Sequence, residues 1–263
     1  MVEPQAARPG AAGFTSHGLA EGAILLFVLL WWSTARGLPA FVLPGPWDVL
    51  RTFGTLLVEP SLLIHVGVSF ARITAALVLT MALAIGLGLA ARASDLFAAV
   101  LEARILLVLN SFPGVGWAIL GVMWFGVSNG TVIFIQVAIV LPFCLIAVLE
   151  GFRQIDADLE EMGRSFTRRR WRSFTRVTLP LLAPFLISGL RVATGIAWKI
   201  ALVAELFGAQ TGLGYLLVQA QSNANAAMVF AICLVIVVIV FALDRLLLRP
   251  LAQAYSRNQG GSS

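Results

Sequence analysis

The stretch that decides the fold is EGFRQIDADLEEMGRSFTRRRWRSFTRVTLP, from Glu150 to Pro180. Its charges are seven arginines and a smaller group of acids, while the sequence on either side is almost wholly apolar. Ionic side chains are costly in hydrocarbon, so this charged segment lies in water. Its length exceeds the few residues that a simple connection between antiparallel helices needs, which indicates a function of its own.

The composition indicates an integral membrane protein. Of the 263 residues, 59% are hydrophobic and 12% are charged, whereas soluble domains carry about a quarter charged residues. The excess of Lys+Arg over Asp+Glu, 18 against 13, falls in loops between apolar segments, as the positive-inside rule requires. The expected contact is therefore the lipid bilayer and not nucleic acid. Cys144 and Cys233 stand alone in apolar runs, so no metal site is expected.

Apolar segments of spanning length predict an all-α membrane protein with six transmembrane helices. The expected spans are residues 20–35, 62–91, 105–127, 131–149, 181–207 and 226–243. Six spans leave both termini on one side of the membrane. The loops with Arg92 and Arg104, the charged segment and the C-terminal arginines all fall on that side, which predicts an N-in, C-in topology.

The domain organisation follows from these spans. Residues 1–19, rich in Ala, Gly and Pro, are expected to form a mobile cytoplasmic tail, and no cleavable signal peptide is evident. Residues 20–250 form the transmembrane domain, with the cytoplasmic loop 150–180 inside it. Residues 251–263 are the C-terminal tail. The proline-rich loop after the first span is expected to hold a short interfacial helix, Trp47–Val58.

The third span is interrupted by Pro113, Gly114 and Gly116. Irregular backbone at membrane depth is tolerated where protein or a water-filled path covers it. The interruption therefore either lines a pathway or is a packing kink, and the sequence leaves both open.

An apolar stripe runs along the charged segment, formed by Ile155, Leu159, Met162 and Phe166 at helical spacing. Two interpretations remain open for it. The stripe can lie on lipid or on the protein's own spans, or it can dock into a soluble partner. The length of the segment favours docking.

The charged segment resembles the cytoplasmic loop of bacterial ABC-importer permeases, with its pattern Glu-Ala-Ala, a later glycine, and an apolar-Leu-Pro ending. Here Glu161, Met162 and Gly163 occupy the first three positions, and Val177–Pro180 is the ending. Thr167 stands where the family has its turn glycine. Glycine suits turns with φ > 0, so either this turn avoids that conformation or the two helices run on more continuously.

Short motifs outside the loop resemble the nitrate/sulfonate/taurine branch of these permeases. They are His65-x3-Ser69-x2-Arg72, Phe112-Pro113, Trp124-Phe125-Gly126-Val127, Gly189-Leu190-Arg191, Ala204-Glu205, Gly212-Leu213-Gly214 and Asp244-Arg245. Each is weak alone, but their order and spacing over residues 38–250 are specific.

The resemblance implies a type I ABC importer permease fold in the bacterial plasma (inner) membrane. It implies a homodimer that works with two cytoplasmic ABC ATPase subunits, which hold ATP and Mg²⁺, and with an extracytoplasmic solute-binding protein. The loop would be the coupling helix between spans four and five. The coupling residues would be Ile155, Asp158, Leu159, Glu160, Glu161, Met162, Gly163, Phe166 and Thr167.

The chain itself is not expected to be an enzyme, to contain catalytic residues or to hold a cofactor. It contains no G-x-x-x-x-G-K-[ST] phosphate loop, so the energy for transport would come from the partner ATPases.

Candidate residues for a solute path lie mainly in the fifth span. Arg191, Trp198 and Glu205 are spaced by seven and share a helical face, with Thr194 between them. Lys199, the only lysine, either faces the path and favours an anionic solute or is paired inside the protein. Asn110, Ser111 and Gln136 are further polar candidates.

Rival functions remain. An ion-coupled secondary transporter would need carboxylates within spans, and only Glu205 lies near such a position. A membrane-embedded enzyme would need clustered Asp, His or Ser at a membrane face, and the acids of the charged segment lie among arginines without a metal-ligand pattern. The branch transports sulfonates, taurine, nitrate, bicarbonate or heterocyclic vitamin precursors, and the sequence does not choose among them.

Overall fold

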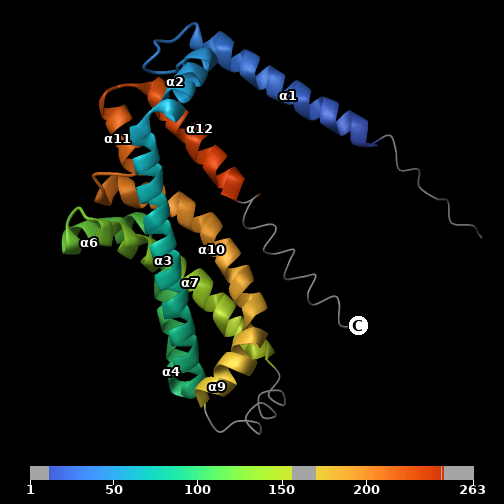
Figure 1. Cartoon of the computed structure of the whole chain (residues 1–263), viewed down its shortest axis with the longest axis vertical. Coiled ribbons are helices and arrows are strands. Elements are labelled where there is room, and N and C mark those ends of the chain that lie inside the picture. The colour runs from blue at the N-terminus through green and yellow to red at the C-terminus, as the bar shows by residue number, and fades with distance from the viewer. Residues whose placement is uncertain (1–11, 156–169, 244, 246–263) are drawn as a thin grey trace, which may run out of the picture. The chain divides into compact units, whose positions relative to one another are not determined.

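The computed structural model describes residues 12–155, 170–243 and 245, and these are helical apart from short connections (Figure 1). No strand occurs in this described part, which confirms the all-α class. The chain divides into two compact units. One holds residues up to Val58 together with Ala220–Leu234, and the other holds Glu59–Gln219 and the residues from Val235 onward.

The first unit contains α1 (Ala12–Ala35), α2 (Pro46–Val58) and the beginning of α12 (Ala226–Leu243). Trp31 joins these parts. Its indole Nε1 donates to the Pro44 carbonyl oxygen at 3.0 Å, and its ring stacks on Phe230 with 5.9 Å between centroids.

Two expectations for this unit can be compared with the structure. The short helix predicted at Trp47–Val58 is present as α2, which starts at Pro46, a residue suited to the first helical position. Residues 12–19, which were expected to belong to a mobile tail, are helical, because α1 begins at Ala12, and residues 1–11 lie outside the described residues. The apolar run of the first span nucleates the helix, and each residue added in front of it gains one hydrogen bond at little cost.

Three long helices form the core of the second unit: α3 (Pro60–Ala93), α7 (Asn129–Gln154) and α10 (Leu179–Gly208). They lie side by side (Figure 1). At two close approaches, Gly88 of α3 lies against Val148 of α7, and Gly189 of α10 lies against Ala147 of α7. Small residues of this kind let membrane helices pack closely.

The same contacts fix the directions of the three helices. Arg72 of α3 bonds Asn129 of α7 near the start of both helices, so α3 and α7 run parallel. Gly208, at the end of α10, lies against Thr131 near the start of α7, so α10 runs antiparallel to both.

The third predicted span is bent. Its helix begins at α4 (Asp95–Val100) and continues through the π-helical turn η1 (Leu101–Ile105) into α5 (Leu106–Ser111). After Phe112 and Pro113 the chain turns by 87° into α6 (Gly114–Phe125). Pro113 lacks the N–H that would continue the ladder of α5, and it forms the N-cap of α6.

Short helices lie on either side of α10. α9 (Arg170–Ser173) and the π-helical turn η2 (Phe174–Thr178) lead into it, and α11 (Leu213–Ser222) lies between the fifth and sixth predicted spans. Residues 156–169, the centre of the charged segment, lie outside the described residues.

By length and hydropathy, fewer described helices than the six predicted spans are long and apolar enough to cross a membrane. In the described part of the chain, three helical segments can cross a membrane: Pro60–Ala93, Asn129–Gln154 and Phe174–Gly208. The bent pair from Asp95 to Phe125 makes a fourth if it counts as one span. Glu21–Ala35 and Ala226–Ala242 are apolar but shorter.

Candidate functional site

A buried ion pair joins two of the three core helices at one end of the bundle. Nη1 of Arg72 on α3 lies 2.9 Å from Oε1 of Glu205 on α10. The side chains are 5% and 0% exposed. Removing either charge from water is costly, and the arrangement holds only because each ion pairs and the remaining polar atoms find hydrogen bonds.

The Glu205 carboxylate is enclosed by donors. The backbone N–H of Gly214 donates to Oε2 at 2.9 Å, and Oγ of Ser69 lies 2.8 and 2.9 Å from the two carboxylate oxygens. The Ser69 oxygen also accepts the backbone N–H of Leu213 at 2.9 Å. One carboxylate thus ties α3, α10 and the segment that follows α10.

The Arg72 guanidinium uses its remaining donors on two further elements. Nε and Nη2 donate to Oδ1 of Asn129 on α7 at 2.9 and 2.6 Å. Nη1 and Nη2 donate to the carbonyl and hydroxyl oxygens of Thr211 at 2.7 and 2.8 Å. The planar fork of arginine suits this task, because several acceptors lie around one plane.

His65 fixes the segment after α10 from a second point. The backbone N–H of Gly212 donates to its Nδ1 at 2.9 Å, and the imidazole stacks on Tyr215 with 6.2 Å between ring centroids. An imidazole nitrogen that accepts a hydrogen bond carries no proton. His65 thus holds the backbone of the segment after α10 through its hydrogen bond to Gly212.

Gly212 and Gly214 let the chain wrap around the carboxylate. Gly212 has φ +108°, a conformation that side chains rarely adopt, and a Cβ there would overlap the Glu205 carboxyl group. A Cβ on Gly214 would lie against the backbone carbonyl of Leu202. The two glycines are therefore a steric requirement of the Glu205 site.

A smaller ionic contact lies at the opposite end of α3 and α7. Arg153, in the last turn of α7, pairs with Glu102 of η1 and lies 3.9 Å from Glu150. Arg92 stacks over the Phe152 ring at 5.6 Å. A cavity of about 140 Å³ lies among these side chains. The helix end from which the charged segment leaves is thus fastened to the start of the third span.

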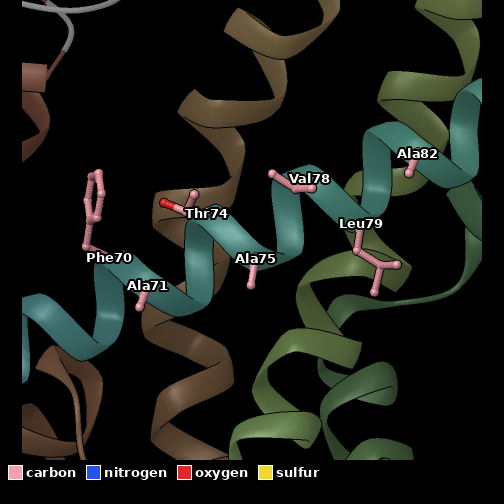
Figure 2. Close-up of a pocket in the computed structure, with 7 residues that line it drawn as sticks. All are labelled: Phe70, Ala71, Thr74, Ala75, Val78, Leu79 and Ala82. Atoms are coloured by element: carbon pink, nitrogen blue, oxygen red, sulfur yellow. The ribbon is translucent and has the colours of Figure 1, made fainter.

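A shallow apolar groove follows the outer face of α3 (Figure 2). Its volume is about 630 Å³, and its lining is Phe70, Ala71, Thr74, Ala75, Val78, Leu79 and Ala82. Phe70 at one end contacts the Trp198 ring of α10, with 6.4 Å between centroids. The small residues make this face suitable for close contact with another helix.

Comparison with known proteins supports the family resemblance of the motifs that contribute Glu205 and Gly212-Leu213-Gly214 to this site. The sequence profile of the family described as binding-protein-dependent transport system inner membrane component matches residues 82–249. The chain belongs to this family. It is an ABC-importer permease similar to those of the sulfonate and taurine type.

Three relatives show how far the similarity extends. A "Probable ABC transporter permease protein" of Brucella melitensis is 30% identical over 81% of this chain and 86% of its own length. A protein of Bacillus subtilis named for aliphatic sulfonates transport, the permease SsuC, is 29% identical over 83% and 80%. The taurine transport system permease protein TauC of Escherichia coli is 27% identical over 86% and 84%.

Several family motifs of the permease form the Glu205 cluster. His65, Ser69 and Arg72 belong to one motif, Glu205 to a second, and Gly212-Leu213-Gly214 to a third. Sequence reasoning assigned Glu205 to the solute path and gave Arg72 no partner. A search for a countercharge could have found the pair, because a buried arginine in a span requires one and Glu205 is the acid nearest the interior of another span.

The structure separates the expected path residues of the permease into two groups. Arg191, Lys199, Asn110 and Ser111 are exposed, and Thr194 is half-buried with its hydroxyl donating to the Leu190 carbonyl at 2.7 Å. Trp198, Glu205 and Gln136 are buried within the subunit, at 3%, 0% and 0% exposure. Arg191, Trp198 and Glu205 thus do not share one environment within the subunit, because Arg191 is exposed whereas Trp198 and Glu205 are buried.

Most expected coupling residues of the permease cannot be placed. Ile155 follows the last residue of α7 and is half-buried. Asp158, Leu159, Glu160, Glu161, Met162, Gly163, Phe166 and Thr167 lie outside the described residues.

Proposed function

We propose that two copies of this permease form the solute path of an ATP-driven importer for a small anionic solute such as a sulfonate, taurine, nitrate or bicarbonate. Selectivity would be shared with an extracytoplasmic solute-binding protein, and energy would come from two cytoplasmic ABC ATPases. ATP and Mg²⁺ would be bound by those ATPases, with no cofactor in this chain.

The observation that carries the proposal is the exposure of two cations on one apolar helix. Arg191 and Lys199 of α10 both reach the surface of the described subunit. They are eight residues apart, about 12 Å along a helix. Exposed cations within a span are unfavourable in lipid and belong at a water-filled path or a subunit contact. A path bordered by cations on α10 favours an anion.

The homodimer gives these cations a suitable location. A second copy opposite α10 would enclose the surface that carries Arg191 and Lys199 and keep it from lipid. The small-residue groove on α3 offers a further apolar face for helix contact. Thr194, Asn110 and Ser111 would add hydroxyl and amide groups along the same path.

The proposed topology has six spans with both termini in the cytoplasm. The bent pair from Asp95 to Phe125 then counts as the third span, and the shorter helices at Glu21–Ala35 and Ala226–Ala242 as the first and sixth. Residues 20–250 form the transmembrane domain, between an N-terminal tail and the tail 251–263. The loop 150–180 lies on the cytoplasmic side, and the Glu205 cluster lies near the outer face.

The charged segment would be the coupling helix. Its apolar stripe would occupy a groove of the ATPase, and Asp158, Glu160 and Glu161 would pair at the rim. Arg153 and Glu102 hold the end of α7 to the third span, so a movement of the coupling helix would reach both helices. Closure of the ATPase dimer would then drive alternating access by a rigid-body change.

Reconstitution tests this proposal. The permease is co-expressed with the ABC ATPase and the binding protein of its proposed system, purified and placed in proteoliposomes. We expect ATP-dependent uptake of at least one of taurine, an alkanesulfonate, nitrate or bicarbonate, and no uptake with an ATPase that lacks its phosphate-loop lysine. Uptake driven by an ion gradient without ATP would favour a secondary transporter. ATP-driven uptake of a heterocyclic vitamin precursor alone would contradict the anionic solute.

A further inference from the structure

A second polar layer lies deeper in the bundle than the Glu205 cluster. Thr80 on α3 and Gln136 on α7 are both 0% exposed. The Thr80 hydroxyl, and both the amide nitrogen and the amide oxygen of Gln136, have no hydrogen-bond partner in the described part of the chain. Thr194 shows the usual alternative, because its hydroxyl donates to the carbonyl one turn back.

Helix geometry puts these two residues at nearly the same depth. The bond between Arg72 and Asn129 aligns the parallel helices α3 and α7. Thr80 lies eight residues beyond Arg72, and Gln136 seven beyond Asn129. At 1.5 Å per residue these separations are about 12 and 10.5 Å. The layer thus lies about two turns below the ion pair.

The third helix brings two buried alanines to this depth, beside Trp198, which contacts Phe70 of α3. Ala197 and Ala201 of α10 are 0% and 2% exposed, and they lie two turns and one turn before Glu205. Their methyl groups offer no hydrogen bond.

The buried amide of Gln136 does not stabilise the present packing of the helices. A buried amide without partners pays the full cost of its desolvation, whereas an apolar side chain of similar shape would pay none. Neither lipid nor a second subunit can reach a side chain that is already 0% exposed. A buried water or a different arrangement of the helices would supply the missing partners.

We propose that Gln136 is a positioning residue whose amide forms its hydrogen bonds in the second packing of the transport cycle, with the Thr80 hydroxyl and the backbone of α3 as partners. A small shift of α7 along α3 would bring the Gln136 amide within hydrogen-bond distance of these partners. Apolar packing favours the present arrangement, whereas the hydrogen bonds of Gln136 would favour the second one. The two contributions oppose each other, which keeps the two states close in free energy. The inference rests on the proposed function.

The test uses the reconstituted complex and the near-isosteric replacement Gln136→Met. Ile135→Met, at a neighbouring and equally buried apolar position, is the matched control. Thermal unfolding is followed without nucleotide and after trapping with ATP and vanadate, and ATP-driven uptake is measured in parallel. We expect Gln136→Met to raise the unfolding midpoint of one state and lower that of the other. Uptake should fall about tenfold, the population change that ~1.4 kcal/mol produces.

Thr80→Val supplies a second measurement. It should reduce uptake in the same direction, and the double variant with Gln136→Met should lose little more than Gln136→Met alone, because both changes remove one interaction. Ile135→Met should shift both states equally. Equal midpoint shifts in the two states for Gln136→Met, or a decrease in both, would overturn the inference, since the amide would then contribute equally throughout the cycle. Absence of wild-type uptake would instead contradict the proposed function.

Discussion

Arg72 and Glu205 are 133 residues apart in the chain, yet their charged groups lie 2.9 Å apart inside the helix bundle. Around them, Ser69, Asn129 and Thr211 satisfy the remaining donors and acceptors. The pair and its partners thus join α3, α7 and α10 to the segment that follows α10. This relationship leads to the first two predictions.

Breaking the pair on one side should destabilise the permease more than removing both charges. Arg72→Met leaves the carboxylate buried without a countercharge, at a cost of about 3–5 kcal/mol. Glu205→Gln leaves the guanidinium in the same position but keeps an acceptor for Gly214. The double variant, Arg72→Met with Glu205→Gln, should have a higher midpoint of thermal unfolding than Arg72→Met alone. A double variant whose loss equals the sum of the single losses would show that the two groups are not coupled.

Gly212→Ala should also destabilise the cluster. Its Cβ would overlap the Glu205 carboxyl group, and φ at this position is +108°. We expect a lower unfolding midpoint and less folded protein in the membrane fraction. Gly86→Ala is the control, because nothing lies within 4 Å of a Cβ there and alanine favours helix. Equal effects of the two changes would contradict the steric role of Gly212.

Charge reversal at Glu161 should uncouple transport. Glu161→Lys places a cation where the coupling helix is expected to pair with the ATPase, so ATP-driven uptake should fall at least tenfold while the permease stays in the membrane. The measurements are uptake, ATPase stimulation and co-purification of the ATPase. Glu59→Lys, on the opposite face of the proposed topology, should keep all three. Full uptake by Glu161→Lys would reject the coupling assignment.

Lys199→Met should weaken uptake of an anionic solute. It removes a cation from the exposed face of α10 and keeps an unbranched side chain. We expect a several-fold lower uptake rate that depends on solute charge, measured across anionic and neutral substrates of the same binding protein. Val192→Met, another exposed position on α10, should change little. If Lys199→Met leaves uptake and ATPase stimulation unchanged, the lysine has a structural role.

Much of the helical architecture could be predicted because hydropathy is a local property. The spans at 131–149, 181–207 and 226–243 are close to α7, α10 and α12. The angle of the 87° bend after Ser111 could not be predicted, because Pro113, Gly114 and Gly116 indicate a break in the helix but not its direction. α11 was missed, since a stretch between two spans carries little periodicity of its own.

The candidate site was predictable only in its parts. Each motif of the Glu205 cluster was visible, but no local pattern says that residues from α3, α7, α10 and the segment after α10 share one carboxylate. The spacing of Arg191, Trp198 and Glu205 places them on one helical face but does not say which of them a neighbouring helix covers. Within the subunit Arg191 is exposed, whereas Trp198 and Glu205 are buried.

The sequence by itself determined that this chain is a helical membrane protein of the ABC-importer permease family with a charged loop between its fourth and fifth apolar segments. Those features depend on hydropathy, charge and motif order, which are properties of the chain. Only the tertiary structure decided that Arg72 neutralises Glu205, and that the buried Gln136 amide has no hydrogen-bond partner among the described residues. Both depend on the register between helices, which close packing at small residues sets and the linear order of residues does not record.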